Sequence, residues 1–169
     1  MVLEDTSTGE KLEAVIEPMK SKDFKIVKRS KERFNKFDWN VYQKEEVYKI
    51  RLATDDIILG LMCLVDHTDE ETNAIEIELL EASSENMGPK KKLDHIGGCL
   101  IAYACRESFK RGHDGCVFLT PKTSLVTHYP SKYGFHHMPW KTEKRPEGFM
   151  ILYEDGSRRL IKKYLDQHQ

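Results

Sequence analysis

Alternating hydrophobic and polar positions predict a run of β-strands in the first half of the chain. From Val47 to Leu52 the side chains alternate with the period of two that an extended strand requires. An apolar run from Ile57 to Val65 follows a turn at residues 55–56, and we expect it to pair with the first strand as a hairpin. Ala74 to Ala82 alternates again and has one acidic face, which predicts a third strand.

The next segment changes to helical spacing. We expect Asp94 to be the N-cap of a helix that Gly112 ends. Within it, small or apolar residues recur every three or four positions: Ile96, Leu100, Ala104 and Ser108. Residues 116–119 then predict a short buried strand, which Pro121 stops.

The last third of the chain predicts three more elements. Residues 124–133 are expected to form a short helix that Gly134 closes. Residues 149–153 predict a strand, and Asp155 with Gly156 a turn. Residues 158–166 have the spacing of an amphipathic helix.

The chain before the first strand carries a weaker pattern. Residues 1–19 are polar apart from a short apolar cluster, so we expect a loosely held arm or one short first element. Residues 20–36 contain eight lysines and arginines against two acids, which predicts one solvated helix or two short ones. The element order predicts a single α/β (α+β) domain, with a mixed, mostly antiparallel, twisted sheet of about six or seven strands flanked by helices.

Composition narrows the class of protein. Hydrophobic residues make up 39% and charged residues 33% of the 169 residues, and the net charge of −1 argues against a surface built entirely for nucleic acid. The four cysteines form no CxxC pair. No apolar run of about 18 residues can span a bilayer, and the acidic start lacks the features of a signal peptide, so we expect a cytoplasmic protein.

The segment Lys92-Leu93-Asp94-His95-Ile96-Gly97-Gly98 is the most informative stretch for chemistry. Two glycines in a first helical turn cost on the order of 1 kcal/mol each, so they need a reason. Without Cβ atoms, the free amides of the helix start can approach a diphosphate closely. Close packing of the helix on the sheet uses glycine equally well, whereas the GxGxxG and P-loop motifs are absent.

From Ala74 to Phe135 the sequence resembles the core of the GNAT superfamily of N-acyltransferases. Lys92 stands where that family usually has Arg or Gln, and Ile96-Gly97 with Leu100 matches the end of its glycine loop. Leu93 and His95 occupy positions where glycine is common in the family. Val117-Phe118-Leu119-Thr120 resembles its following strand, and Tyr129 to Gly134-Phe135 its terminal tyrosine and Gly-Phe segment.

The resemblance implies an acyl-CoA site where two neighbouring strands splay apart. The backbone of Leu80 and Ala82 is expected to pair with the pantetheine arm of acetyl-CoA or another acyl-CoA. The amides from Lys92 to Gly98 are expected to hold the pyrophosphate, and Lys90 and Lys91 can add charge or belong to a solvated loop. Tyr129 and Tyr133 compete for the conserved tyrosine role, the second being also a cofactor contact.

The resemblance further implies acylation of an amine by direct attack in a ternary complex. Tyr129 is the candidate acid for the departing thiolate, because a phenol with a pKa near 10 suits that task. Glu81 is the first candidate base and Glu78 the second, although either can be an exposed strand charge. Asn86 and His128 are candidate substrate contacts, the former being explained equally by turn formation.

Two other patterns and two rival functions remain open. His128, His136 and His137 lie close in sequence without accompanying ligands, so we expect no metal site. The first rival is a non-catalytic acyl-CoA sensor. The second acts on aminoacyl-tRNA through residues 20–36, although a solvated face explains those charges too. The acceptor is otherwise a small-molecule or peptide amine; exposed strand edges allow a homodimer.

Overall fold

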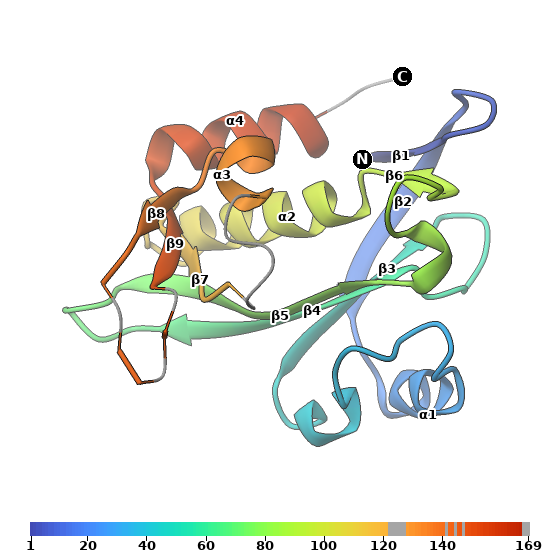
Figure 1. The fold of residues 1–169 in the computed structure, drawn as a ribbon, viewed down its shortest axis with the longest axis horizontal. Coiled ribbons are helices and arrows are strands. Elements are labelled where there is room, and N and C mark those ends of the chain that lie inside the picture. Colours follow the sequence, from blue (N-terminus) through green and yellow to red (C-terminus); the bar gives the residue numbers. More distant parts are fainter. Residues whose placement is uncertain (122–127, 141, 144, 147, 167–169) are drawn as a thin grey trace.

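The computed structural model of the chain describes residues 1–121, 128–140, 142–143, 145–146 and 148–166. Its strands form one sheet with the order β6-β1-β2-β3-β4-β5-β7-β9-β8 (Figure 1). The strands are β1 (Val2–Asp5), β2 (Lys11–Pro18), β3 (Glu46–Leu52), β4 (Gly60–His67), β5 (Ala74–Ala82), β6 (Leu93–Asp94), β7 (Val117–Leu119), β8 (His136–Met138) and β9 (Phe149–Leu152). Every strand pair is antiparallel except β5 with β7, so the sheet is mixed and mostly antiparallel, as predicted.

Helices cover both faces of the sheet. Figure 1 shows α2 (Ile96–Lys110), α3 (His128–Tyr133) and α4 (Glu154–Tyr164) on one side and α1 (Ser21–Arg29) on the other. Two short 3₁₀ helices, η1 (Trp39–Tyr42) and η2 (Ser84–Asn86), follow α1 and β5. The core accordingly has two parts, a large one under α2 and a smaller one under α1.

The elements with strong periodicity agree with the sequence analysis. β5 has the bounds expected from its alternation, and β3 and β4 form the expected hairpin. α2 follows β6 and ends at Lys110, just before Gly112 with its positive φ of 83°. Residues 124–127 of the helix expected over 124–133 lie outside the described residues, and the remainder forms α3.

Three details differ from expectation. The sheet has nine strands among the described residues, because β6 and β8 are too short to show a period of two. Residues 1–19 form the hairpin β1–β2 with Leu3 fully buried, although a loose arm or one element was expected. Asp155 and Gly156 lie in the first turn of α4, where acidic side chains favour a helix start.

The start of α2 also differs in one residue. His95 is the N-cap, with a left-handed backbone at φ 80°, whereas Asp94 was the expected cap. Asp94 belongs to β6 and pairs with Glu4 of β1, which draws it into the sheet. Its carboxylate nevertheless accepts a hydrogen bond from the His95 amide at 2.8 Å.

A buried ion pair attaches α1 to the sheet. Lys49 Nζ lies 2.8 Å from Asp23 Oδ1, and only 7% and 3% of the two side chains are exposed. Asp23 also accepts from the Lys20 amide at 2.8 Å, which holds the first turn of the helix. Glu17 contributes a second, more exposed carboxylate 3.5 Å from Lys49. The position of α1 therefore depends on a desolvated ion pair between Lys49 and Asp23.

Candidate functional site

A bulge in β5 controls which backbone groups face the neighbouring strands. The Ile75 amide donates to Cys116 at 3.1 Å, toward β7, and the Ser83 amide donates to Leu59 at 2.9 Å, toward β4. An uninterrupted strand would send both amides the same way, because the two residues are an even number apart. The register skips Glu78, so the alternation reverses there.

The reversal turns the backbone of Leu80 and Ala82 away from β4. β7 pairs with β5 only from Ile75 to Ile77, so this part of β5 has no strand partner on that side among the described residues. Both residues line a pocket that lies there. The sheet therefore opens beside the last residues of β5, with main-chain groups available to an extended ligand.

The start of α2 faces the same pocket with free amides. The first intrahelical bond runs from the Cys99 amide to the His95 carbonyl at 2.9 Å, and no side chain caps the helix. Within the described part of the chain, the amides of Ile96, Gly97 and Gly98 have no acceptor. The first-turn N–H groups and the helix dipole together favour an anion at this point.

Gly97 and Gly98 are explained by different contacts. A Cβ on Gly98 would stand 2.3 Å from the Tyr164 ring, so Gly98 permits α4 to pack closely on α2. A Cβ on Gly97 would stand 3.0 Å from the Tyr133 hydroxyl, and Gly97 lines the pocket. Both explanations offered by the sequence are therefore present, helix packing at one glycine and backbone access at the other.

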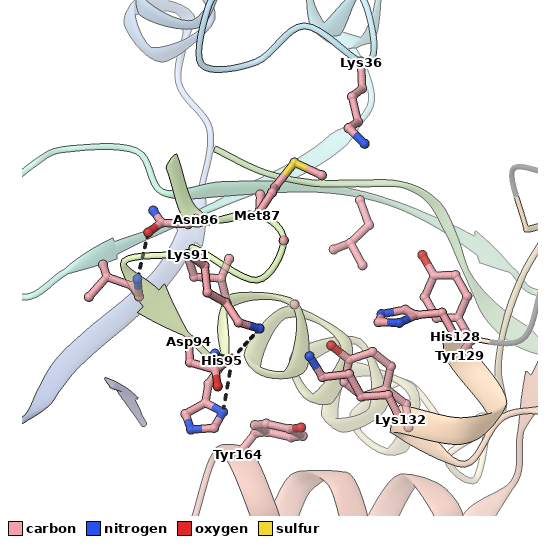
Figure 2. A pocket seen from close by; sticks show the side chains of 17 residues that line it. Lys36, Asn86, Met87, Lys91, Asp94, His95, His128, Tyr129, Lys132 and Tyr164 are labelled. Atoms are coloured by element: carbon pink, nitrogen blue, oxygen red, sulfur yellow. Dashed lines mark hydrogen bonds and ion pairs between the residues drawn. The ribbon is translucent and has the colours of Figure 1, made fainter. Parts of the chain in front are cut away.

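The pocket has a volume of about 300 Å³ and is lined by residues of β5, η2, β6, α2, α3 and α4 and of the loops between elements. Figure 2 shows Lys91 and Lys132 approaching its centre, with Lys36 across from Tyr164. Tyr129 and His128 come from α3. The candidates from the sequence that line it are Leu80, Ala82, Asn86, Leu93, Asp94, His95, Ile96, Gly97, His128, Tyr129 and Tyr133.

Positive charge gathers in the pocket without enough acid to balance it. Lys91 pairs with Asp94 at 3.0 Å, and no acid pairs with Lys132 among the described residues. Burial, followed by repulsion from Lys91, lowers the pKa of Lys132. Burial, followed by the charges of Lys132 and Lys91, lowers the pKa of His128 as well. A group of cations that repel one another is stabilised by a bound anion.

Aromatic rings form the wall opposite β5. Tyr129 and Tyr133 are 9% and 6% exposed, and their ring centroids lie 6.3 Å apart. Tyr133 lies 6.3 Å from the Tyr164 ring, which in turn lies 5.8 Å from the ring of His95. Burial raises the pKa of Tyr129, so its phenol keeps its proton at neutral pH.

Four candidates from the sequence, Lys92, Gly98, Glu81 and Glu78, lie outside the pocket lining. Lys92 is exposed and holds the loop through its backbone, and Gly98 faces Tyr164. Glu81 is 3% exposed; its carboxylate accepts from Trp39 Nε1 at 2.7 Å and from the Lys36 amide at 3.1 Å. Glu78 lies on the same side of the sheet as Tyr42, whose pKa is raised by burial and then by the Glu78 charge.

The side chain of Asn86 holds the loop that follows β5 through two hydrogen bonds. Its amide donates to Ser83 Oγ at 2.9 Å, and its carbonyl oxygen accepts from the Leu93 amide at 2.9 Å. It therefore closes the loop between β5 and β6, which carries Lys91 to the pocket. Lys36, Met87, Lys132 and Tyr164 also line the pocket. Lys36 and Tyr164 lie outside the segment from Ala74 to Phe135, and Met87 and Lys132 lie inside it at positions that its motifs do not include.

Burial makes the cysteine thiols unsuited to nucleophilic catalysis. Burial raises the pKa of Cys63, Cys99 and Cys105 to about 12 and that of Cys116 to a lesser extent, so these thiols are poor nucleophiles. No group of three His, Cys, Asp or Glu side chains among the described residues could hold a metal ion.

None of the described helices is long and apolar enough to cross a membrane.

Comparison with known proteins identifies the fold. No family model matches the sequence, and no curated protein matches it. The Bacillus subtilis N-acetyltransferase YlbP in complex with coenzyme A is 13% identical, with a TM-score of 0.59 over 84% of this chain and 97% of that one. A GNAT-family acetyltransferase from Listeria monocytogenes is 12% identical, with a TM-score of 0.52 over 85% and 94%.

A third structure with the same fold is AtaT complexed with acetyl-methionyl-tRNA. It is 11% identical, with a TM-score of 0.55 over 88% of this chain and 99% of that one. At these identities the likeness concerns the fold alone. It confirms the predicted GNAT-type α/β fold, with more strands than expected.

Proposed function

We propose, from the GNAT fold and the cationic pocket beside β5, that this protein transfers an acyl group from acyl-CoA to a primary amine. The observation that carries the proposal is the continuity of one pocket from the unpaired backbone of β5 to the uncapped start of α2. An extended pantetheine needs the first feature and a diphosphate needs the second. A surface cleft that lacked one of these features could bind only the other part of the ligand.

The arrangement supports a definite placement of acyl-CoA. The pantetheine amides pair with the backbone of Leu80 and Ala82, which continues the sheet by one ligand strand. The pyrophosphate lies at the amides of Ile96 and Gly97, and Lys91 and Lys132 balance its charge. Lys91, rather than the motif residue Lys92, is the loop lysine in the lining. We keep Lys92 and Gly98 as backbone contributors to that loop.

The proposed reaction is direct acyl transfer. The neutral amine nitrogen attacks the thioester carbonyl carbon, a C–N bond forms, and the C–S bond breaks. Tyr129 gives its phenolic proton to the departing thiolate and recovers a proton from solvent; its raised pKa, caused by burial, keeps it protonated beforehand. No covalent enzyme intermediate is formed, in keeping with the burial of three of the four cysteines and the partial burial of Cys116.

We keep Glu81 as the proposed base, acting through a water molecule, with Glu78 second. Both oxygens of Glu81 already accept a hydrogen bond, and each has a second lone pair. The two carboxylates lie on the α1 side of the sheet, whereas Tyr129 lies on the α2 side. The amine and the thiolate would therefore exchange protons with different faces of the sheet.

Replacing the two pocket lysines should weaken acyl-CoA binding and leave the fold intact. In a thermal-shift titration with CoA, acetyl-CoA and longer acyl-CoAs, ligand at about 100 times its Kd stabilises the wild type by about 2.7 kcal/mol. For the Lys91→Gln/Lys132→Gln variant we expect a Kd at least ~10-fold higher, because two phosphate contacts are lost. Lys28→Gln/Lys31→Gln, with equal charge change on the other face, should keep the wild-type shift.

No stabilisation of the wild type by any CoA species would refute the proposal. Stabilisation without turnover on any amine of a broad panel would instead identify the non-catalytic sensor. Equal loss of CoA affinity in both lysine pairs would show that only overall charge matters, and that the pocket is not the site.

Binding of CoA should be accompanied by proton uptake. Burial and two lysines hold the pKa of His128 below its usual value in the free protein, and a bound phosphate raises that pKa. His128 therefore gains a proton on binding, and affinity should rise as the pH falls through the interval between the two values. Calorimetric titrations in buffers with different heats of ionisation measure the uptake. The ligand's own phosphates contribute equally to a His128→Gln variant, so only the difference between the proteins tests this prediction.

A further inference from the structure

A second hollow lies on the α1 side of the sheet. It has a volume of about 470 Å³ and is formed by the end of α1 and the segment from residue 34 to residue 40; we call it the α1 groove. Its charged lining consists of Lys28, Lys31, Lys36 and a single acid, Asp38. Lys36 also lines the acyl-CoA pocket, so the two hollows meet at this residue.

The wall of the α1 groove is fixed to the sheet. Glu81, at the end of β5, accepts from both the Lys36 amide and the Trp39 indole, and Trp39 is 2% exposed. Nearby, Arg33 bonds to the Ile58 carbonyl at 2.9 Å and pairs with Glu85. The groove is therefore formed before any ligand arrives, so binding does not have to order its wall.

The charge around the groove greatly exceeds what a single anionic group needs. Residues 20–36 contain eight lysines and arginines, whereas the whole chain has a net charge of −1. One of the two acids in this stretch, Asp23, is occupied by Lys49. Among the described residues no ion pair involves the exposed cations of this face, which are Lys20, Lys22, Lys25, Lys28, Arg29, Lys31 and Lys36.

The extent of this basic face favours a polymer of phosphates. A small anionic amine would use the groove lysines alone and leave the cations along α1 without a role. A nucleic-acid backbone repeats its charge along its length and can contact the whole series. Phe37, which is half-buried in the groove lining, offers an aromatic surface on which a base can stack.

We propose that the acceptor amine is carried at the end of an RNA whose phosphates lie along α1 and in the α1 groove. Resting on the proposed acyl transfer, this assignment brings the RNA end past Lys36 to the acyl-CoA pocket. The acyl group moves to the amine nitrogen as the thioester C–S bond breaks, and the bond that joins the amine-bearing group to the RNA is unchanged. Glu81 then has a second task, which is to hold the wall at the junction of the two hollows.

The test uses the full chain, [¹⁴C]acetyl-CoA and unfractionated aminoacyl-tRNA as the amine-bearing RNA. The wild type should acetylate this RNA and bind it with a strong dependence on salt. Lys28→Gln/Lys31→Gln should bind it at least ~10-fold more weakly at about 0.1 M salt, with the slope of log K against log salt reduced by about 2. Its thermal shift with CoA should stay that of the wild type. The control Lys110→Gln/Lys162→Gln should bind RNA as the wild type does.

Three results would overturn the assignment while leaving acyl transfer intact. The first is CoA binding without acetylation of the RNA, and the second is equal weakening of RNA binding in both variants. The third is acetylation of small amines or of an acidic peptide that is lost in Lys28→Gln/Lys31→Gln, because the two lysines would then serve a different acceptor. If CoA itself does not bind, the proposed function fails first, so the two failures can be told apart.

Discussion

Tyr129→Phe should lower kcat at least about 100-fold and leave the affinity for acetyl-CoA unchanged. Removal of a positioned general acid typically costs about 10² to 10⁴ in rate, and a phenyl ring preserves the packing of Tyr129 against Phe135. Steady-state kinetics with the best acceptor of an amine panel give kcat, and thermal-shift titration gives the Kd of acetyl-CoA.

Tyr133→Phe is the matched control for that experiment. The Tyr133 hydroxyl lies over Gly97 at the start of α2, so we expect its loss to weaken acyl-CoA binding more than it lowers kcat. The opposite outcome, with kcat lost in Tyr133→Phe and retained in Tyr129→Phe, would exchange the two roles. Retention of kcat in both variants would remove tyrosine from the acid step altogether.

Asp23→Ala should destabilise the protein by about 3 to 5 kcal/mol, because it leaves the Lys49 ammonium buried with only the partly exposed Glu17 nearby. Chemical denaturation monitored by fluorescence measures the loss. Glu17→Ala removes a carboxylate that is 35% exposed, so we expect about 1 kcal/mol or less.

The double variant Asp23→Leu/Lys49→Met separates the ion pair from its desolvation. Replacement of both charges by apolar groups of similar volume should restore most of the stability lost in Asp23→Ala. A double variant as unstable as the single one would show that the pair itself, rather than an uncompensated charge, holds α1 on the sheet.

The fold could be predicted where the periodicity is long. β5 alternates over its whole length with one partly exposed face, and its bounds are those expected from the sequence. β6 has two residues and β8 has three, so neither shows a period, and only their pairing with β1 and β9 makes them strands. The N-terminal hairpin likewise depends on a partner, because β2 pairs with β3 from far along the chain.

The candidate site was predictable only in the part that is local in sequence. The glycine loop predicts the start of α2, and the position of Gly134-Phe135 leaves Tyr129 and Tyr133 as the two candidate tyrosines. Lys132 and Tyr164 reach the pocket because α3 and α4 pack beside α2, which no local pattern encodes. The backbone facing of Leu80 and Ala82 depends on the bulge at Glu78, and an alternating sequence gives no sign of it.

The sequence singles out Glu81 as a candidate base but gives no sign of its hydrogen-bond partners. Its place at the end of an acidic strand face suggested a base, and the structure adds the Trp39 indole and the Lys36 amide. These partners lie more than 40 residues earlier in the chain, as the separations of 42 and 45 positions show. A carboxylate that anchors the wall of the α1 groove through these two hydrogen bonds is a tertiary feature.

The central claim is that free main-chain amides at the start of α2 hold the diphosphate of acyl-CoA. A titration of ¹⁵N-labelled protein with CoA, followed by amide resonances, tests it most directly. We expect saturable shifts at the amides of Gly97, Gly98 and Ala82, with the amides of α1 unchanged. Saturable binding that leaves those three amides unmoved, or that shifts only residues of the α1 groove, would contradict the claim.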